Sequence, residues 1–310
     1  MPWLRLTLST TAPWFEELSD LLLAAGAPAV TALDAGDQPI LEPDPGAMPL
    51  WQHVQVQALW PPEAPLAPLR EQLAAWSAAR QQPMPALDTT FVPDQDWSRT
   101  WRDGLEPRRY GDRLWVLPGD WPDAQDFAGV HLYLDPGLAF GSGTHPTTSL
   151  CLHQLAALPL AGCRLIDYGC GSGILAIAGL LLGADQALAV DHDPQALTAT
   201  RDNAIRNGVA AARLQCCAPG DSKLADWHGQ ADILLANILA GPLTALAPTL
   251  TGLLRPGATL VLSGILASQW PGVAAAYPDV QFATPLIQDD WVCAVGVVAR
   301  PGSEGAPVDG

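Results

Sequence analysis

Residues 165–178 read LIDYGCGSGILAIA, an apolar strand that runs into a glycine-rich turn and the start of a helix. Gly169 and Gly171 open the turn and let the backbone approach a ligand closely at the carboxyl end of the strand. The next apolar segment, 187–190, ends in Asp191, whose carboxylate can accept hydrogen bonds from both hydroxyls of a ribose. The stretch therefore predicts a nucleoside-containing ligand at the edge of a parallel sheet.

Asp167 stands just before this turn and bears on the kind of ligand. A carboxylate here would repel the pyrophosphate of a dinucleotide, whereas it suits a ligand that carries a cationic amine and a sulfonium. The order acid-x-Gly-x-Gly-x-Gly, followed by a second acid, resembles the first two motifs of S-adenosylmethionine-dependent methyltransferases. We therefore expect S-adenosyl-L-methionine as the cofactor and Asp167 among the residues that bind it, with a dinucleotide as the rival ligand.

The chain from about residue 114 onward alternates strands and helices, which predicts an α/β domain with an open, Rossmann-like parallel sheet. Strands are expected at 163–168, 187–191, 232–237, 258–263 and 291–298, and helices at 146–157, 173–183, 194–207 and 241–254. A hairpin-like pair at 280–287 and 291–298 predicts an antiparallel edge. We expect the methyltransferase domain to span 114–300 and the Gly/Pro-rich residues 301–310 to form a disordered tail.

Residues 1–93 follow the order β-α-β-β-α-β, which predicts a small ferredoxin-like α+β domain. The expected strands lie at 3–9, 29–34, 51–60 and 86–92, and the expected helices at 13–25 and 65–79. Residues 94–113 then form a linker with five arginines and two tryptophans. These arginines either pair with the acidic domains on both sides or contact the substrate.

The composition excludes several classes of protein. The 310 residues carry a net charge of −17 and only one lysine, Lys223, so the field of the chain opposes binding to nucleic acid and suits a basic protein or peptide. The N-terminus has no signal pattern, and apolar stretches such as 174–182 are too short to span a bilayer. The six cysteines lack C-x-x-C spacing. We expect a reduced, cytoplasmic protein with no metal site and no membrane contact.

Three further motifs accompany the glycine turn: LDPGLAFGSGTHPTTS at 134–149, ANILAGP at 236–242 and LSGILASQ at 262–269. Together the four motifs closely resemble the PrmA family, the methyltransferases of ribosomal protein L11. The resemblance covers most of residues 94–295, and residues 1–90 match mainly in pattern. One small departure is Ser142, where the family usually has threonine, and the hydroxyl is kept.

The resemblance implies contacts to S-adenosylmethionine from Thr148, Gly169, Asp191 and Asn237, and a lid in which Phe140 lies against the cofactor. It also implies trimethylation of the N-terminal α-amine and of lysine side chains in ribosomal protein L11. The family grips that substrate with its small N-terminal domain on a mobile linker. We expect a monomer.

Asn237 is the candidate catalytic residue. Many amino-group methyltransferases end their fourth strand in Asn/Asp-Pro-Pro-aromatic, where the amide accepts a hydrogen bond from the target nitrogen and the aromatic ring stacks on a planar base. Here the amide stays but Ile238 and Leu239 follow it, so the stacking that a nucleobase needs is missing. Asn237 then orients an aliphatic amine; the alternative is a cap for the helix that begins near Pro242.

The glycines of the segment before Pro146, with Thr144 and Thr148 at a helix start, favour a flexible loop rich in hydrogen-bond donors. His145 can act as a base there, but its place before Pro146 favours a structural role at the helix cap.

Two other functions stay open: a methyltransferase for another protein or a small amine, and an RNA-binding module. The RNA-binding module lacks the interleaved basic and aromatic residues that it would need.

Overall fold

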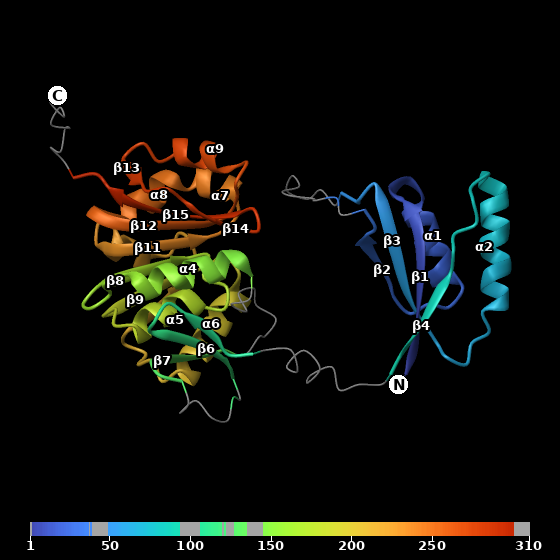
Figure 1. The fold of residues 1–310 in the computed structure, drawn as a ribbon, viewed down its shortest axis with the longest axis horizontal. Coiled ribbons are helices and arrows are strands. Elements are labelled where there is room, and N and C mark those ends of the chain that lie inside the picture. The colour runs from blue at the N-terminus through green and yellow to red at the C-terminus, as the bar shows by residue number, and fades with distance from the viewer. Residues whose placement is uncertain are drawn as a thin grey trace. The chain divides into compact units, whose positions relative to one another are not determined.

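The computed structural model describes residues 2–36, 38, 49–93, 106–119, 121, 127–134 and 145–300. The chain divides into two compact units, Met1–Asp103 and Gly104–Gly310. Figure 1 shows the first unit in blue to cyan and the second in green to red. Among the described residues, no helix is both long enough and apolar enough to cross a membrane.

The N-terminal unit is a four-stranded antiparallel sheet with two helices. Its elements are β1 (Trp3–Thr11), α1 (Ala12–Ala24), β2 (Val30–Asp34), β3 (His53–Trp60), α2 (Ala67–Arg80) and β4 (Asp88–Val92). The sheet order β2-β3-β1-β4 is the arrangement expected for a ferredoxin-like domain.

One face of this sheet forms the core of the unit. In β3, Val54 and Val56 are buried whereas Gln55 and Gln57, which alternate with them, are not, because successive side chains in a strand point to opposite faces. Leu18 of α1 and the equally buried leucines of α2 pack in the same cluster. The helices therefore cover one face of this sheet.

The C-terminal unit contains an eight-stranded mixed sheet. Its strands are β8 (Arg164–Tyr168), β9 (Gln186–Val190), β10 (Leu214–Cys217), β11 (Ala231–Asn237), β12 (Leu254–Leu266), β13 (Val280–Phe282), β14 (Leu286–Gln288) and β15 (Trp291–Val298). The order is β10-β9-β8-β11-β12-β15-β13, with β14 paired to β15. Strands β8 to β12 run parallel and β15 runs antiparallel to β12. The Rossmann-like sheet and its antiparallel edge are thus confirmed.

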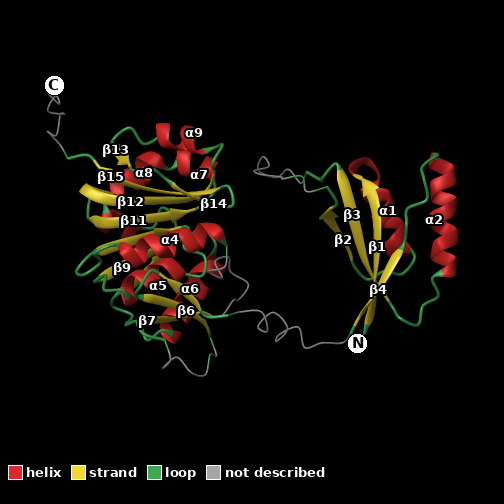
Figure 2. Cartoon of the chain, viewed as in Figure 1, coloured by secondary structure: helices red, strands yellow, loops and turns green. Residues whose placement is uncertain are grey.

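Helices cover both faces of the sheet. One face carries α4 (Pro146–Ala157), α5 (Ile174–Leu181) and α6 (Pro194–Arg206). The other carries α7 (Ala240–Ala245), α8 (Ala247–Leu253) and α9 (Trp270–Ala275). In the cartoon of Figure 2, the helices of this unit flank the strands in the same way.

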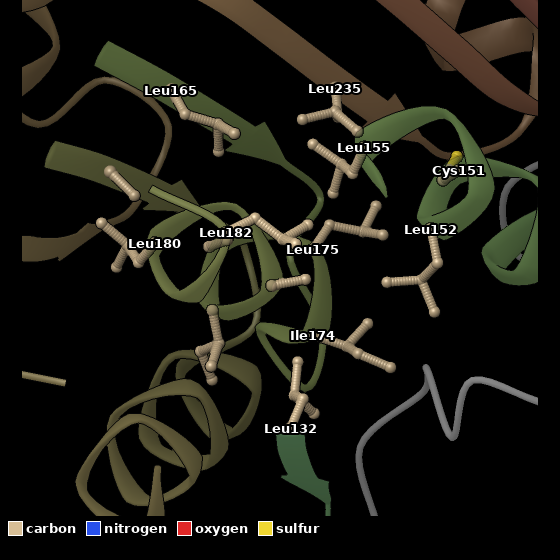
Figure 3. Close-up of a cluster of buried hydrophobic side chains, with 14 of the residues drawn as sticks. Leu132, Cys151, Leu152, Leu155, Leu165, Ile174, Leu175, Leu180, Leu182 and Leu235 are labelled. Atoms are coloured by element: carbon tan, nitrogen blue, oxygen red, sulfur yellow. The ribbon is translucent and has the colours of Figure 1, made fainter. Parts of the chain in front are cut away.

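The apolar run of β11 shows why the strands lie between two layers. Leu235 packs in the cluster with α4 and α5, whereas its neighbour Leu234 packs in the cluster with α7 and α8. Figure 3 shows the first cluster, where Leu155 of α4 and Leu175 of α5 lie near Leu235. A strand buried on both faces needs apolar side chains at every position, which accounts for the run.

Besides β10 of the main sheet, three short strands were not expected from the sequence. They are β5 (Arg108–Tyr110), β6 (Leu114–Pro118) and β7 (Val130–Leu134), which form a separate sheet. Strand β5 falls inside the range expected as a linker, where the many charged residues hid it. Tyr110 and Leu132, which are buried against the cluster of α4 and α5, hold this sheet to the main body.

The single helix expected at 241–254 is two helices in the structure. The break falls at Leu246, which ends α7 and precedes α8. Pro248 has no N–H to donate to the carbonyl of Thr244, so one continuous helix would lack a hydrogen bond there. The proline instead occupies the first turn of α8, the position that tolerates it.

Candidate active site

The carboxyl edge of the parallel strands encloses a cavity of about 590 Å³. Its described lining residues are His145, Thr147, Tyr168, Gly169, Val190, Asp191, His192, Pro219, Asn237, Ile238, Leu239, Pro242, Leu246, Gly264 and Trp291. These residues come from the ends of β8, β9, β11 and β12, from the start of β15, from the start of α4, from the loop after β10 and from α7 with its C-cap. Parallel strands end at the same edge of a sheet, and an antiparallel strand begins there, so segments far apart in the chain meet.

The glycine turn reaches the cavity with its first residue, Gly169. Gly169 has a φ of 82° and Gly171 a φ of 51°, values that L side chains rarely adopt. The N–H groups of Gly169 and Cys170 both donate to the carbonyl of Val190, at 2.7 and 3.1 Å. A Cβ on Gly169 would lie 2.2 Å from Cγ2 of Ile238. The turn is therefore fixed against β9 and admits only glycine at its first position.

Asp191 holds its carboxylate at the cavity wall. The N–H of Gly171 donates to Oδ2 at 2.9 Å, and the N–H of Asp193 donates to Oδ1 at 3.0 Å. Each oxygen keeps further capacity to accept a hydrogen bond. Because both oxygens are fixed by backbone groups, the carboxylate is preorganised to receive two vicinal hydroxyls.

Asp167 lies beneath the turn, 1% exposed, and it does not line the cavity. Its Oδ2 accepts a hydrogen bond from the N–H of Ala176 at 3.0 Å, and no described group donates to Oδ1. Burial raises the pKa of Asp167 to about 7, against the lowering effect of the Ala176 N–H and with a further rise from the charge of Asp191. A cation bound above the turn would favour the ionised form of this carboxyl.

Asn237, the last residue of β11, reaches the cavity with its amide. Its Nδ2 donates to Oγ1 of Thr148 in α4 at 3.3 Å, and no group of the described residues donates to Oδ1, the acceptor atom of the amide. Thr148 is 1% exposed and lies behind Asn237, so the structure brings these two predicted residues together. The alternative role of Asn237 as a helix cap does not hold, because Leu239 is the N-cap of α7 and no side chain caps that helix.

His145 caps α4, as the sequence favoured, and it also lines the cavity. Its Nδ1 accepts a hydrogen bond from the N–H of Thr147 at 3.3 Å and lies 2.8 Å from Oγ1 of the same residue. Burial lowers the pKa of His145. The ring is therefore neutral at pH 7, and the tautomer that accepts at Nδ1 carries its proton on Nε2.

Several expected site residues lie outside the described part of the chain. These are the lid residue Phe140 and the hydroxyl-bearing Ser142 and Thr144. Their roles stay predictions.

The sequence reasoning missed several residues that line the cavity, above all Thr147, His192, Pro219 and Trp291. His192 follows Asp191 directly, so its place next to the second acid was a usable signal. The sequence could also have predicted Trp291 as a lining residue, because Trp291 begins a strand that was expected to be antiparallel. The start of such a strand lies at the edge where the parallel strands end.

The described residues fit S-adenosylmethionine. The carboxylate of Asp191 suits a ribose diol, and Val190, Pro219 and Ile238 offer apolar surface for a purine. The orphan oxygen of Asp167 places a buried negative potential beneath the turn, which suits a cationic ligand. The volume of about 590 Å³ lies within the range of small-molecule sites.

Comparison with known proteins shows the family to which this chain is similar. The family model described as ribosomal protein L11 methyltransferase (PrmA) matches residues 2–298. A ribosomal protein L11 methyltransferase of Marinobacter nauticus is 48% identical over 301 residues, which cover 96% of this chain and 98% of the relative. One of Azotobacter vinelandii is 49% identical over 298 residues, 96% of this chain and 99% of the relative.

The chain is also similar to a solved structure of a ribosomal protein L11 methylase. The crystal structure of a ribosomal protein L11 methylase from Lactobacillus delbrueckii subsp. bulgaricus is 30% identical, with a TM-score of 0.55. The match covers 63% of this chain and 100% of that one. With a family model that spans nearly its whole length, this chain belongs to the ribosomal protein L11 methyltransferase (PrmA) family.

Proposed function

We propose that this protein transfers methyl groups from S-adenosylmethionine to amino groups of ribosomal protein L11. The observation that carries the proposal is the Asn237 amide, whose nitrogen is held by Thr148 and whose oxygen is left to accept at the cavity wall. An acceptor without a neighbouring aromatic ring on its own strand end suits an aliphatic amine better than a nucleobase.

S-adenosylmethionine supplies an electrophilic methyl group when it is bound. Asp191 binds its ribose, and the turn at Gly169 and Gly171 lets the backbone lie close to it. The carboxyl of Asp167 favours the cationic end of the cofactor from beneath the turn. We also assign Phe140 to a lid over the methionine end, in keeping with the family resemblance.

The amine must arrive deprotonated, because its lone pair attacks the methyl carbon. Reference pKa values are about 8 for an α-amine and about 10.4 for lysine, and an apolar cavity near a positive charge lowers both. The described lining is mainly apolar, and its one carboxylate, Asp191, follows β9, which β8 separates from the strand that ends in Asn237. Orientation by Asn237 and desolvation by Leu239 and Leu246 carry the catalysis, without a dedicated base.

We assign the N-terminal unit to substrate recognition, with residues 1–93 as the docking domain and the following segment as its linker. The net charge of −17 suits a basic substrate such as a ribosomal protein. The targets are the N-terminal α-amine and lysine side chains, taken to the trimethylated state, and the reaction takes place in the cytoplasm.

The test is incubation of the full-length protein with purified ribosomal protein L11 and labelled S-adenosylmethionine, followed by intact-mass analysis and peptide mapping. We expect label on L11, at amino groups, and much less with Asn237→Ala at equal cofactor occupancy. A parallel reaction with a cell lysate is the control for substrate choice. Label on another protein, on RNA or on no macromolecule would contradict the proposal.

A further inference from the structure

The side chain of Trp291 lies in the active-site cavity, and nothing in the glycine motif or the Asn237 motif accounts for it. Trp291 opens β15 and pairs with Leu266 at the carboxyl end of β12. It follows a two-residue turn, Asp289 and Asp290, in which both residues have positive φ, at 49° and 66°. The N–H of Ala267 donates to the carbonyl of Asp290 at 2.9 Å. The turn and the pairing thus fix the position of the indole.

The imidazole ring of His145 packs against the indole of Trp291 in a T-shaped contact. The ring centroids of Trp291 and His145 lie 5.0 Å apart at an interplanar angle of 68°. His145 is in turn fixed at the start of α4 through Thr147, and its lowered pKa keeps it uncharged at pH 7. The support therefore adds no positive charge that would repel a cation at the indole.

Other tryptophans of the chain already hold a cation. The guanidinium carbon of Arg80 lies 5.4 Å from the ring centroid of Trp76, and that of Arg164 lies 4.2 Å from the ring centroid of Trp227. In the described ranges, no arginine or lysine is placed in this way on Trp291. Among the described residues, the indole of Trp291 therefore has no cation of the protein on its face.

Successive methylation changes which groups can hold the substrate. In each transfer the lone pair of the amine nitrogen bonds to the methyl carbon, the bond from that carbon to sulfur breaks, and its electron pair stays on sulfur. The nitrogen then carries a positive charge and, after the first two transfers, releases a proton to water. A neutral primary amine has two N–H bonds for acceptors such as Asn237 Oδ1, a secondary amine has one, and the tertiary amine formed by two methylations has none.

Asn237 therefore cannot orient the amine for the third transfer through a hydrogen bond. What remains at this end of the cavity is apolar surface and the indole of Trp291. Methylated ammonium groups bind well to aromatic faces, and tryptophan is the best of these. The third transfer also creates a permanent cation, and the one carboxylate of the described lining, Asp191, follows β9, which β8 separates from β11 and β15.

We propose that Trp291 is the residue that sets the degree of methylation, because it holds the methylated amine when Asn237 no longer can. This inference rests on the proposed function and adds a division of labour to it. Asn237 serves the early transfers most, and Trp291 serves the last transfer most.

The experiment compares two forms of ribosomal protein L11 as substrates for the full-length enzyme. Unmodified L11 reports the first transfer, and L11 dimethylated at its amines by formaldehyde and a borohydride reductant reports the third. Initial rates are measured by intact mass at saturating S-adenosylmethionine. The variants are Trp291→Leu, Trp291→Phe and Asn237→Ala, with Trp270→Leu as the control, since Trp270 packs on Phe282 away from the cavity.

We expect Trp291→Leu to lower the third-transfer rate roughly tenfold and the first-transfer rate less than about threefold. Trp291→Phe should fall between this variant and the wild type, Asn237→Ala should show the opposite bias, and Trp270→Leu should leave the ratio of the two rates unchanged. If Trp291→Leu misfolds, the ratio for Trp291→Phe decides.

An unchanged ratio in the Trp291 variants, or an equal loss of both transfers, would overturn the inference and leave the proposed function standing. A wild-type enzyme that methylates neither form of L11 would instead overturn the proposed function. A wild-type enzyme that methylates unmodified L11 but never the dimethylated form would also overturn the inference.

Discussion

The amide nitrogen of Asn237, at the end of β11, donates a hydrogen bond to the hydroxyl of Thr148, in the first turn of α4, over 3.3 Å. The two residues are 89 positions apart in the chain. Thr148 thereby decides which end of the amide remains as an acceptor at the cavity wall. Asn237 is the group that meets the substrate amine in the proposed reaction, and Thr148 is the residue that positions it.

Replacement of Thr148 by valine should lower kcat roughly fivefold, because one neutral hydrogen bond contributes about 1 kcal/mol and the amide of Asn237 is then free to rotate. The affinity for S-adenosylmethionine, measured by calorimetry, should change less than about twofold. Thr148→Ser, which keeps the hydroxyl, is the matched control and should retain most of the rate. A large loss of cofactor affinity in Thr148→Val would show direct contact with the cofactor instead.

Replacement of Asp191 by alanine should weaken S-adenosylmethionine binding about a hundredfold or more, since two charge-assisted hydrogen bonds to the ribose are lost. Calorimetric titration measures the effect, and thermal unfolding checks that the variant stays folded. Asp193→Ala removes an equal charge two residues away, where the side chain caps α6 by accepting from the N–H of Gln195. Similar losses in both variants would reduce the role of Asp191 to general electrostatics.

The buried carboxyl of Asp167 should make the stability of the cofactor-free protein fall as the pH rises through 7. Its pKa is raised from 3.8 to about 7, so the native state binds a proton that the unfolded state has lost. The resulting stabilisation is fully present below pH 3.8 and disappears as the folded group ionises, with a loss of about 1 kcal/mol between pH 6 and pH 8.

Asp167→Asn is the variant that checks this prediction, because its neutral amide mimics the protonated acid. Denaturant unfolding at pH 6, 7 and 8 should give a shallower pH dependence for the variant than for the wild type. Two parallel curves would mean that Asp167 does not titrate in this range.

Gly264 should not tolerate a side chain. Its φ is 85°, and a Cβ there would lie 2.3 Å from the backbone oxygen of Ile238, the residue after Asn237. Gly264→Ala should therefore displace the end of β11, lower the free energy of unfolding by about 2 kcal/mol or more, and reduce turnover. Gly272→Ala is the control, since a Cβ in that helical position would meet nothing within 4 Å. Equal stability and activity of the two variants would refute the argument.

A protein that starts at Gly104 should bind S-adenosylmethionine with normal affinity, because every described residue of the cavity lies after that point. Its activity on ribosomal protein L11 should fall strongly, since the tethered domain no longer raises the local concentration of the amine. Addition of residues 1–103 as a separate protein should restore little. Full activity of the shortened enzyme on intact L11 would show that the first unit is not the docking domain.

The sequence by itself determined the features that lie within short windows. The strand, turn and helix around Gly169, the acid at Asp191 and the amide at Asn237 each depend on neighbours in the chain, so their local patterns were sufficient. The order of strands and helices followed from hydrophobic periodicity, apart from the helix α9, the division of one expected helix into α7 and α8, and the strands β5 to β7 and β10. Those strands are short, and β5 lies in a stretch whose charges masked it.

Tertiary structure decided which side chains meet. The bond between Asn237 and Thr148 and the contact between His145 and Trp291 join elements that are distant in sequence, and no local pattern encodes such pairs. Trp291 reaches the cavity only because β15 returns antiparallel to β12 and so begins at the edge where the parallel strands end. The raised pKa of Asp167 likewise arises from burial, and burial depends on how all the layers of the fold pack around that residue.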